Sequence, residues 1–284
     1  MTFYLNPNDL KKFAICLKNI ENPMRNIARL ISHIKNVPYH HILFNREKIE
    51  MRDEEYTIFL NFLYRLMKNE PISKIINKKE FYGFEFFTNE YTLDPRFETE
   101  IIVDIFQKYI SNTSQNLNIL DLGCGTGCIG ISIMNIYKNV YVDFVDIENK
   151  TLGVCMMNAR KYNVLDRSNF IQSNWFQNIH KKYDIIVSNP PYISTDYKLD
   201  RSVLFDPYIS LFSGKNGMDS YREIIPNIHK FLVKNGHAFI EIGFDQYNQI
   251  MSLIHDNFNI KFIECIKDLN GIDRTFVIQN ISED

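Results

Sequence analysis

Cysteine is scarce in this chain, and no apolar run is long enough to cross a membrane. The five cysteines are an odd number without a CxxC pair, so we expect neither a disulfide framework nor a zinc knuckle. The seven histidines lack metal-ligand spacings such as HExxH. The first residues lack the apolar core of a signal peptide, and no run approaches the roughly 18 apolar residues of a membrane helix. These absences predict a soluble, cytoplasmic protein with no metal site and no membrane anchor.

A surplus of basic residues is missing as well. Thirty-two Lys and Arg stand against 34 Asp and Glu, which gives a formal charge of -2. Proteins that bind phosphate backbones usually carry a clear basic excess, so we expect no direct nucleic-acid binding. With 45% hydrophobic and 23% charged residues, the composition is that of an ordinary globular protein. The length of 284 residues corresponds to about two domains of roughly 150 residues, and we expect a monomer.

The first part of the chain has helical periodicity. Apolar residues recur on one face from Leu10 to Leu17 and from Ile58 to Leu66. Glycine is absent before Gly83, which suits a compact unit with few tight turns. We therefore predict a small all-helical N-terminal domain over residues 1–80. The extended aromatic stretch that follows predicts a small hairpin and linker over residues 81–100.

From residue 101 onward, short apolar strands alternate with helices. The predicted strands are Asn118–Leu122, Val140–Asp146, Phe170–Gln172, Tyr183–Ser188 and Ala238–Ile242, and the predicted helices are Ile129–Tyr137, Lys150–Tyr162, Tyr221–Leu232 and Tyr247–His255. This alternation predicts an α/β domain over residues 101–284, with a mostly parallel sheet covered on both faces. Ligands of such sheets bind beyond the carboxyl ends of the strands, which is where the motifs below fall.

A glycine loop follows the first of these strands. Gly123, Gly125 and Gly127 allow the backbone to turn sharply and to approach a ligand closely, and the next helix offers free N–H groups. Gly125-x-Gly127-x-x-Gly130 matches the dinucleotide fingerprint, and Asp146 follows 21 residues after Gly125, at a spacing that suits a ribose diol. A tight strand-to-helix turn without a ligand is the alternative reading of the loop alone.

The residue Asp121 distinguishes between nucleoside cofactors. The string D-x-G-x-G-x-G that it begins resembles the first motif of class I S-adenosylmethionine methyltransferases, and it includes Cys124 and Thr126. A carboxylate suits a cofactor with an amine and a sulfonium better than one with a pyrophosphate. Cys124 and Cys128 have no further ligands nearby in sequence, which argues against a metal. An NAD-dependent dehydrogenase stays as an alternative.

The tetrapeptide Asn189-Pro190-Pro191-Tyr192 follows another strand. The prolines fix the backbone, so the Asn189 side-chain oxygen and the Pro190 carbonyl can accept both N–H bonds of a planar NH2 group, while Tyr192 stacks on its plane. Such a nitrogen is a poor nucleophile, and holding both hydrogens directs it at a methyl donor and stabilises the developing positive charge. A rigid proline turn is the alternative. The residues thus predict methyl transfer to an amide or a base.

An ordered set of further motifs makes the resemblance specific. It comprises Glu80–Gly83, Leu93–Glu100, Ser188–Ile193, Phe205–Pro207, Gly214–Asp219, Glu241–Gly243 and Asp273–Arg274. The chain resembles the release-factor glutamine methyltransferases, the PrmC/HemK family, which methylate the glutamine of the GGQ tripeptide in class 1 peptide chain release factors. The resemblance implies a Rossmann-like class I methyltransferase domain with a seven-stranded sheet, S-adenosyl-L-methionine as cofactor, and a helical N-terminal domain that recognises the release factor.

The resemblance also implies roles for individual residues. Asp121, Gly123, Cys124, Gly125, Thr126 and Gly127 would bind the methionine part of the cofactor, Asp146 its ribose and Trp175 its adenine, while Asn189, Pro190, Pro191 and Tyr192 would hold the substrate amide. Asn189 would also lie near the cofactor, and the catalytic residues would be Asn189, Pro190 and Tyr192. A core anchor is the alternative role for Trp175, the only tryptophan.

The chain departs from the family pattern at three single positions and in the stretch Pro71–Asn77, which lacks the expected tyrosine and glycine. Asn174 stands where relatives have an acidic residue, so we expect weaker cofactor binding, and Asp94 and Phe97 replace the usual isoleucine and proline.

The nearest rival function is an amino-methyltransferase that acts on adenine or guanine of DNA or RNA, with the base flipped into the same loop. The non-enzymatic alternative is a scaffold protein that binds the cofactor but does not catalyse methyl transfer.

Overall fold

The computed structural model describes residues 2–45, 47–110 and 115–283. Within these residues the chain folds into two compact units. The first unit reaches to Lys78 and includes Leu199–Phe205, and the second comprises Lys79–Lys198 and the chain from Asp206 onward. Residues 81–100, which the sequence suggests as hairpin and linker, therefore belong to the second unit.

The first unit is built from short helices around an apolar core. Its elements are β1 (Thr2–Leu5), α1 (Pro7–Cys16), α2 (Pro23–Lys35), α3 (Tyr39–Leu43), β2 (Ile49–Arg52), α4 (Asp53–Met67) and α5 (Ile72–Ile76). Helix α1 begins with a capping box, in which the side chains of Asn6 and Asp9 bind each other's backbone N–H groups. Ile27 and Leu30 from α2 and Phe59 from α4 are completely buried in the core.

The prediction of an all-helical first unit was wrong in one respect. Strand β1 pairs antiparallel with β2, with Leu5 opposite Ile49 and Phe3 opposite Met51. Ile49 and Met51 are buried and the residues after each are exposed, which is the period of two that a half-buried strand requires. Four residues are too few for this alternation to stand out beside the helical periodicity on either side.

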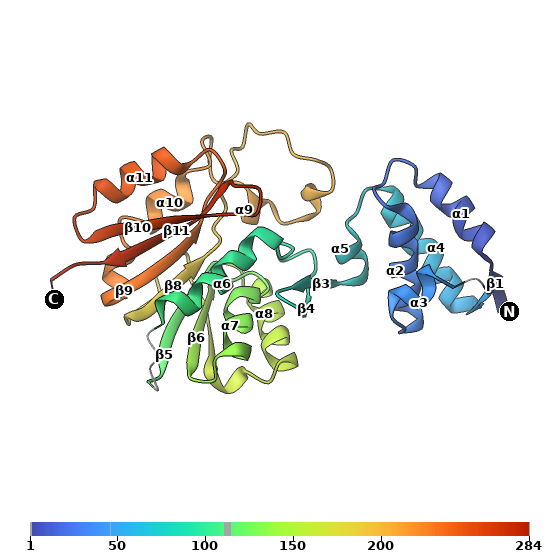
Figure 1. Ribbon diagram of the computed structural model, residues 1–284, viewed down its shortest axis with the longest axis horizontal. Coiled ribbons are helices and arrows are strands. Elements are labelled where there is room, and N and C mark those ends of the chain that lie inside the picture. The colour runs from blue at the N-terminus through green and yellow to red at the C-terminus, as the bar shows by residue number, and fades with distance from the viewer. Residues whose placement is uncertain (1, 46, 111–114, 284) are drawn as a thin grey trace. The chain divides into compact units, whose positions relative to one another are not determined.

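The second unit contains the sheet that the sequence predicts. Its strands are β5 (Leu117–Leu122), β6 (Val140–Asp146), β7 (Ser168–Gln172), β8 (Tyr183–Ser188), β9 (Leu232–Glu241), β10 (Ile260–Lys267) and β11 (Asp273–Asn280). In the described residues this sheet has seven strands in the order β10-β11-β9-β8-β5-β6-β7 (Figure 1). Strands β5 to β9 pair in parallel, and β11 is antiparallel to both β9 and β10. The predicted α/β class is confirmed.

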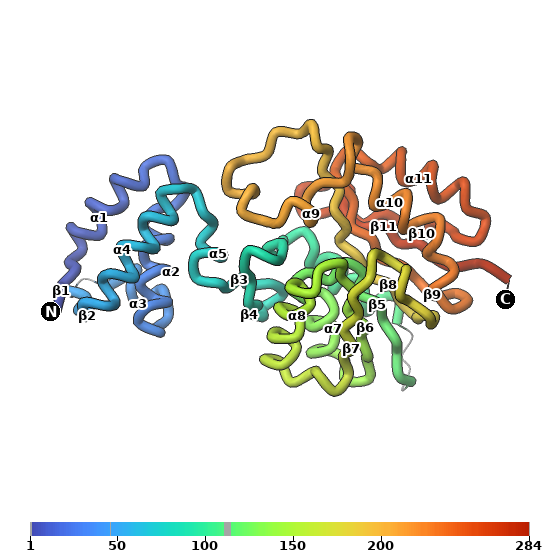
Figure 2. Tube along the Cα trace, turned by 180° about the vertical axis from the view of Figure 1, so that it is seen from behind, coloured from blue at the N-terminus to red at the C-terminus, as the bar shows by residue number. Residues whose placement is uncertain are grey.

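Helices cover both faces of this sheet (Figures 1 and 2). They are α6 (Glu100–Tyr109), α7 (Cys128–Ile136), α8 (Asn149–Lys161), α10 (Asp219–Ile224) and α11 (Tyr247–His255). The unit also contains the short helix α9 (Tyr208–Leu211) and the hairpin of β3 (Lys78–Phe81) with β4 (Phe84–Phe87). Successive β5 residues face opposite layers: Ile119 packs in the layer with α6, α7 and α8, and Leu120 in the layer with α10 and α11. The buried strands therefore read as continuous apolar runs.

Short 3₁₀ turns complete the unit and explain one difference from the prediction. A further turn, Val203–Phe205, belongs to the first unit. Those of the second unit span Phe97–Thr99, Leu165–Arg167 and Ile228–Phe231. The helix predicted over Tyr221–Leu232 is divided between α10 and the last of these turns. Pro226 lies between the two parts, and proline cannot donate the hydrogen bond that would continue the helix.

One buried side chain joins the hairpin to the glycine loop. Asn158 on α8 is inaccessible to water. Its Oδ1 accepts the N–H of Phe87 at 2.8 Å, and its Nδ2 donates to the carbonyl oxygens of Phe87 and Thr126, both at 3.0 Å. Three backbone groups in two different segments thus depend on one carboxamide.

We predict that Asn158→Asp destabilises the second unit. The aspartate has no N–H to donate, so the carbonyls of Phe87 and Thr126 lose their partner beside a buried carboxyl group. The free energy of unfolding should fall by about 2–4 kcal/mol, measured by urea denaturation. The matched control is Asn169→Asp on the exposed face of β7, which should change stability by less than about 0.5 kcal/mol. If both variants changed the free energy of unfolding by less than about 0.5 kcal/mol, this account would be contradicted.

Candidate active site

The carboxyl ends of three parallel strands meet at one edge of the sheet. Strand β5 lies between β6 and β8, with Leu122 opposite Val145 and Asp121 opposite Val187. A cavity of about 360 Å³ opens at this edge. Of the residues that the sequence suggests for the site, Gly123, Cys124, Gly125, Thr126, Asp146, Trp175, Asn189 and Pro191 line it.

Four suggested residues, Asp121, Gly127, Pro190 and Tyr192, lie outside the lining of this cavity. Gly127 has a φ of 76° at the start of α7, and a Cβ there would lie 2.5 Å from the Cys155 sulfur. The glycine is therefore required by the packing of α7. Pro190 is buried, and the Tyr192 ring packs against the apolar layer of α10 and α11.

Asp121 lies behind the glycine loop. Its Oδ2 accepts the N–H of Gly130 at 3.0 Å, whereas Oδ1 is buried and has no hydrogen-bond partner among the described residues. Burial raises the pKa of Asp121 to about 7, partly offset by the bond from Gly130. Beneath the loop, the Asp121 carboxyl group can therefore either hold a proton or, when ionised, attract a cationic group.

The glycine loop and Asp146 are bound to each other. The N–H of Gly125 donates to Asp146 Oδ2 at 3.1 Å and the N–H of Glu148 donates to Oδ1 at 3.2 Å. Each carboxylate oxygen keeps a further lone pair. A Cβ on Gly125 would meet no atom of the described chain within 4 Å, and one on Gly123 would lie 3.5 Å from the Trp175 ring. The loop is therefore an open cradle with an acceptor group at one side and an aromatic ring at the other.

The positions that depart from the family pattern differ in their surroundings. Asn174 is exposed and lines the cavity beside Trp175. Asp94 is buried, and its carboxylate accepts the Thr88 hydroxyl at 2.7 Å. Its backbone N–H donates to Asp206 at 3.0 Å. Phe97 is 65% exposed. Asp94 therefore has a structural role in holding the segment before α6.

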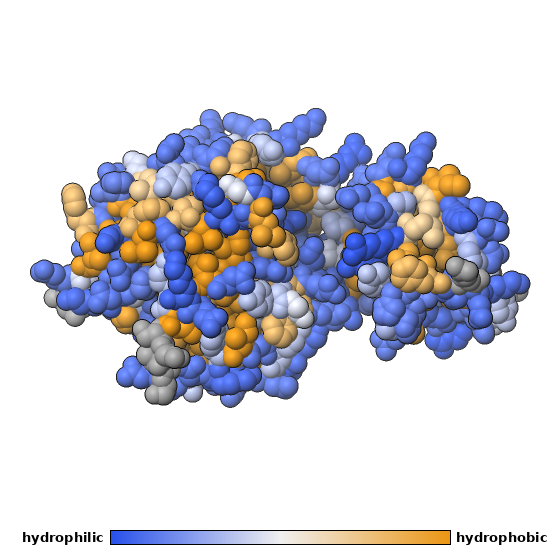
Figure 3. All heavy atoms as spheres, viewed as in Figure 1, coloured by the Kyte–Doolittle hydropathy of each residue, from blue (hydrophilic) through white to orange (hydrophobic). Residues whose placement is uncertain are grey.

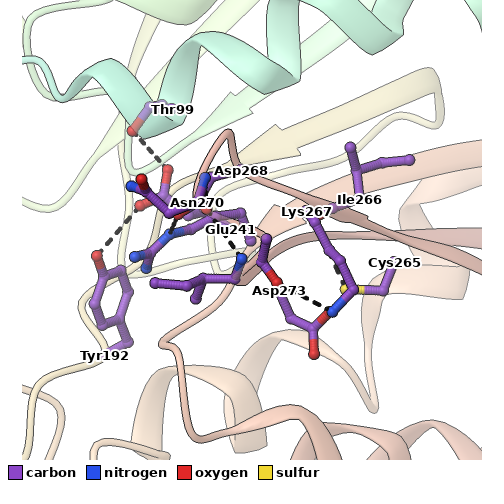
Figure 4. Close-up of polar contacts among 12 residues, drawn as sticks. Thr99, Tyr192, Glu241, Cys265, Ile266, Lys267, Asp268, Asn270 and Asp273 are labelled. Carbon is purple, nitrogen blue, oxygen red and sulfur yellow. Dashed lines mark hydrogen bonds and ion pairs between the residues drawn. The ribbon is translucent and has the colours of Figure 1, made fainter.

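The catalytic loop predicted from the sequence carries a chain of hydrogen bonds to a buried carboxyl group. Asn189 Nδ2 donates to Thr99 Oγ1 at 2.9 Å, and Thr99 Oγ1 donates to Glu241 Oε2 at 2.5 Å. The Tyr192 hydroxyl donates to Glu241 Oε1 at 3.3 Å. Figure 4 shows Thr99 and Tyr192 directed at the Glu241 carboxyl group from two sides. The Asn189 side-chain oxygen is thereby left to accept a bond from elsewhere.

The backbone of this loop is fixed by Gln246. Gln246 Nε2 donates to the carbonyls of Tyr192 at 2.9 Å and Gly217 at 3.0 Å, while Oε1 accepts the N–H of Gly243 at 3.0 Å. A Cβ on Gly217 would lie 2.2 Å from the Tyr192 carbonyl oxygen. The glycines of these two motifs, Gly217 and Gly243, therefore allow the chain around Gly217 and Gln246 to approach the loop at Tyr192 closely.

Sequence reasoning missed the roles of Thr99, Glu241 and Gln246. Glu241 ends the apolar strand β9 and is 1% exposed, and burial raises its pKa to about 7 against the opposing effects of Thr99 and Arg274. A charged residue at the end of an otherwise apolar strand is the signal that could have identified it. Thr99 lies in the motif Leu93–Glu100, which does not reveal its partner, and Gln246 lies outside the motifs; the partners of both are distant in sequence.

Metal clusters and membrane-spanning helices are both absent from the part of the chain that the structure describes. Residues 2–45, 47–110 and 115–283 contain no group of three or more His, Cys, Asp or Glu side chains that could hold a metal ion. None of the helices in these ranges has the length and apolar character needed to cross a membrane.

Comparison with known proteins identifies the fold. The model of the methyltransferase small domain family matches residues 96–204. A solved methyltransferase from Pyrococcus furiosus is 17% identical and superposes with a TM-score of 0.51, covering 78% of this chain and 98% of that one. With the strand order above, these matches confirm the predicted class I Rossmann-like methyltransferase fold.

Comparison with curated relatives identifies the family. A bifunctional methyltransferase from Rickettsia prowazekii is 36% identical over 98% of this chain and 56% of its own length, so the chain spans about half the length of the curated relatives of that name. A release factor glutamine methyltransferase from Buchnera aphidicola subsp. Schizaphis graminum is 35% identical over 93% of this chain and 95% of its own length. On this full-length similarity, the chain belongs to the release factor glutamine methyltransferase family.

Proposed function

We propose that this protein transfers a methyl group from S-adenosyl-L-methionine to the side-chain amide nitrogen, N5, of the glutamine in the GGQ motif of class 1 peptide chain release factors. The observation that carries the proposal is the orientation of Asn189, whose Nδ2 is held by Thr99 at 2.9 Å. Its oxygen is then free to accept an N–H of the substrate. The family relationship supplies the identity of the substrate.

The cradle beneath the cavity fits the cofactor. The Asp121 carboxyl group lies behind the glycine loop, where its ionised form would attract a cationic cofactor, and the space beside Gly125 admits a ligand. In the proposal, the segment from Gly123 to Gly127 holds the methionine part, Asp146 the ribose hydroxyls and Trp175 the adenine. When bound, the cofactor supplies a methyl group activated by a positively charged sulfur.

The chain's own residues prepare the amide nitrogen for methylation. Asn189 Oδ1 accepts one N–H of the substrate amide and the Pro190 carbonyl accepts the other, which orients the nitrogen. The same two acceptors stabilise the positive charge that develops on it. Pro191 lines the cavity and bounds it on one side, while Tyr192 supports the loop through Glu241. No general base is required, because the N–H becomes acidic only after the transfer.

The first unit recognises the release factor in this proposal. It exposes large apolar side chains at its surface, among them Ile15 on α1, Phe44, and Tyr64 and Met67 on α4, with exposed fractions between 54% and 77%. Figure 3 shows apolar side chains among the hydrophilic ones on the face of this unit that it displays. Exposed apolar groups with a polar surround are typical of protein contact sites. The enzyme would act in the cytoplasm as a monomer, without binding nucleic acid itself.

We predict that methylation of a purified release factor collapses in Asn189→Ala. The parent protein should add a single methyl group to the GGQ peptide, detected by mass spectrometry. Removing an acceptor that stabilises the transition state should lower kcat by about 10²–10³-fold. Asn169→Ala, an exposed change on β7, is the control and should retain the parent rate. Methylation of DNA or RNA adenine or guanine with the release factor left unmodified would refute the proposal.

We predict that Asp146→Ala weakens cofactor binding. The variant loses the carboxylate that would accept the ribose hydroxyls, and hydrogen bonds to charged groups are worth about 1.5–3 kcal/mol. Calorimetry with S-adenosylhomocysteine should therefore show a Kd raised by about 10–100-fold. Asp166→Ala, at an exposed position outside the cavity, should leave the Kd unchanged. Binding of NAD by the parent, and no binding of S-adenosylhomocysteine, would refute the cofactor assignment.

A further inference from the structure

We propose that Thr99 and Glu241 are positioning residues that decide which end of the Asn189 carboxamide faces the substrate. This inference rests on the proposed function, since it concerns the same amide substrate. Neither residue lies in the glycine loop or in the tetrapeptide from Asn189 to Tyr192. Thr99 lines the cavity, and the two residues are bonded to the tetrapeptide through Asn189 and Tyr192.

The direction of the hydrogen bonds follows from the number of protons available. A threonine hydroxyl has one proton to donate, and an ionised carboxylate can only accept. Thr99 must therefore donate to Glu241, at 2.5 Å, and its oxygen must accept from Asn189, at 2.9 Å. Only Nδ2 of the carboxamide can make that bond. The Asn189 oxygen is consequently the atom left for the substrate.

The opposite arrangement would present the wrong group to the substrate. If the Glu241 carboxyl group donated to Thr99, the Thr99 proton would turn toward Asn189, and the carboxamide would flip to offer its oxygen to Thr99. The Asn189 NH2 would then face the NH2 of a glutamine substrate, donor against donor. Such a site would suit a carboxylate instead. The charge of Glu241 thus selects a glutamine amide over a glutamate side chain.

The surroundings of Glu241 allow both protonation states. The groups that face it are the hydroxyls of Thr99 and Tyr192, and the charges of Arg274 and Glu98 also act on it. Its main-chain carbonyl accepts the Tyr221 hydroxyl at 3.0 Å. Burial raises the pKa of Glu241 from its usual value near 4.5 to about 7. The productive, ionised state therefore predominates above pH 7 and is lost below it.

The sheet provides a matched control for Thr99. Thr275 on β11 lies opposite Glu241 in the antiparallel pairing with β9. It is completely buried, and its hydroxyl has no hydrogen-bond partner among the residues described. Thr99→Val and Thr275→Val therefore make the same chemical change at two buried positions near Glu241. Only the first change breaks the bonds between Asn189 and Glu241.

Kinetics of release factor methylation provide the first test. Thr99→Val should lower kcat/KM by about 10–100-fold at pH 8, because the carboxamide is free to flip, and Thr99→Ser should restore it to within about threefold of the parent. Thr275→Val should match the kcat/KM of the parent.

The pH profile provides a second kinetic test. Between pH 6 and 8 the kcat/KM of the parent should rise with pH as Glu241 ionises, and the kcat/KM of Thr99→Val should not show this rise. A step near pH 7 that survives unchanged in Thr99→Val would count against the inference, because the bonds from Glu241 to Asn189 through Thr99 would then not be its source.

A readout without substrate separates this inference from the proposed function. In a ¹⁵N–¹H spectrum, the Asn189 side-chain NH2 signal, assigned by its absence in Asn189→Ala, should shift with a midpoint near pH 7 in the parent and in Thr275→Val. In Thr99→Val it should not shift. If the parent shows this titration but methylates no release factor, the proposed function fails and the positioning role stands. If Thr99→Val equals Thr275→Val in rate and in spectrum, the positioning role is overturned.

Discussion

Glu241 lies at the end of β9 with 1% of its surface exposed, so its carboxyl group has to find its hydrogen bonds within the chain. The donors come from two distant segments: Thr99 precedes α6, and Tyr192 belongs to the loop after β8. Arg274 on β11 adds positive charge nearby. A single buried group therefore ties the catalytic loop and the segment before α6 to the centre of the sheet.

The parallel sheet brings the loops of the site together at one edge. Strand β8 pairs with β5 on one side and β9 on the other, so the loops after these strands emerge side by side. The glycine loop after β5 offers the cradle, and the loop after β8 carries Asn189. Asp146 ends β6, the next strand along, and accepts the N–H of Gly125 from the neighbouring loop. Three neighbouring strand ends thus contribute the groups that we propose as the cofactor cradle, its acceptor and the amide that binds the substrate.

The sequence was sufficient for the fold and for the residues at the strand ends. The bounds of β6 and β8 agree with the prediction, because continuous apolar runs between turn residues are a strong local signal. The strands β10 and β11 were not assigned, since antiparallel strands with mixed polarity resemble loops. The β1–β2 pairing in the first unit was missed because four-residue strands carry little periodicity.

The supporting residues of the site could not be found in the same way. Thr99 and Glu241 are 142 positions apart in sequence, and Gln246 reaches Tyr192 across 54. Contacts of this range depend on the tertiary fold, and the motif Leu93–Glu100 around Thr99 does not reveal which residues its hydroxyl contacts. Motifs can thus name the groups that touch a ligand, whereas the groups that orient them emerge from the structure.

A crystal structure of the protein with S-adenosylhomocysteine and a GGQ peptide would test the central claim most directly. This account predicts that the glutamine amide nitrogen lies within hydrogen-bond distance of both Asn189 Oδ1 and the Pro190 carbonyl oxygen, with Asn189 Nδ2 still bound to Thr99. A glutamine side chain bound elsewhere in the cavity, or an Asn189 carboxamide with its NH2 toward the peptide, would contradict it.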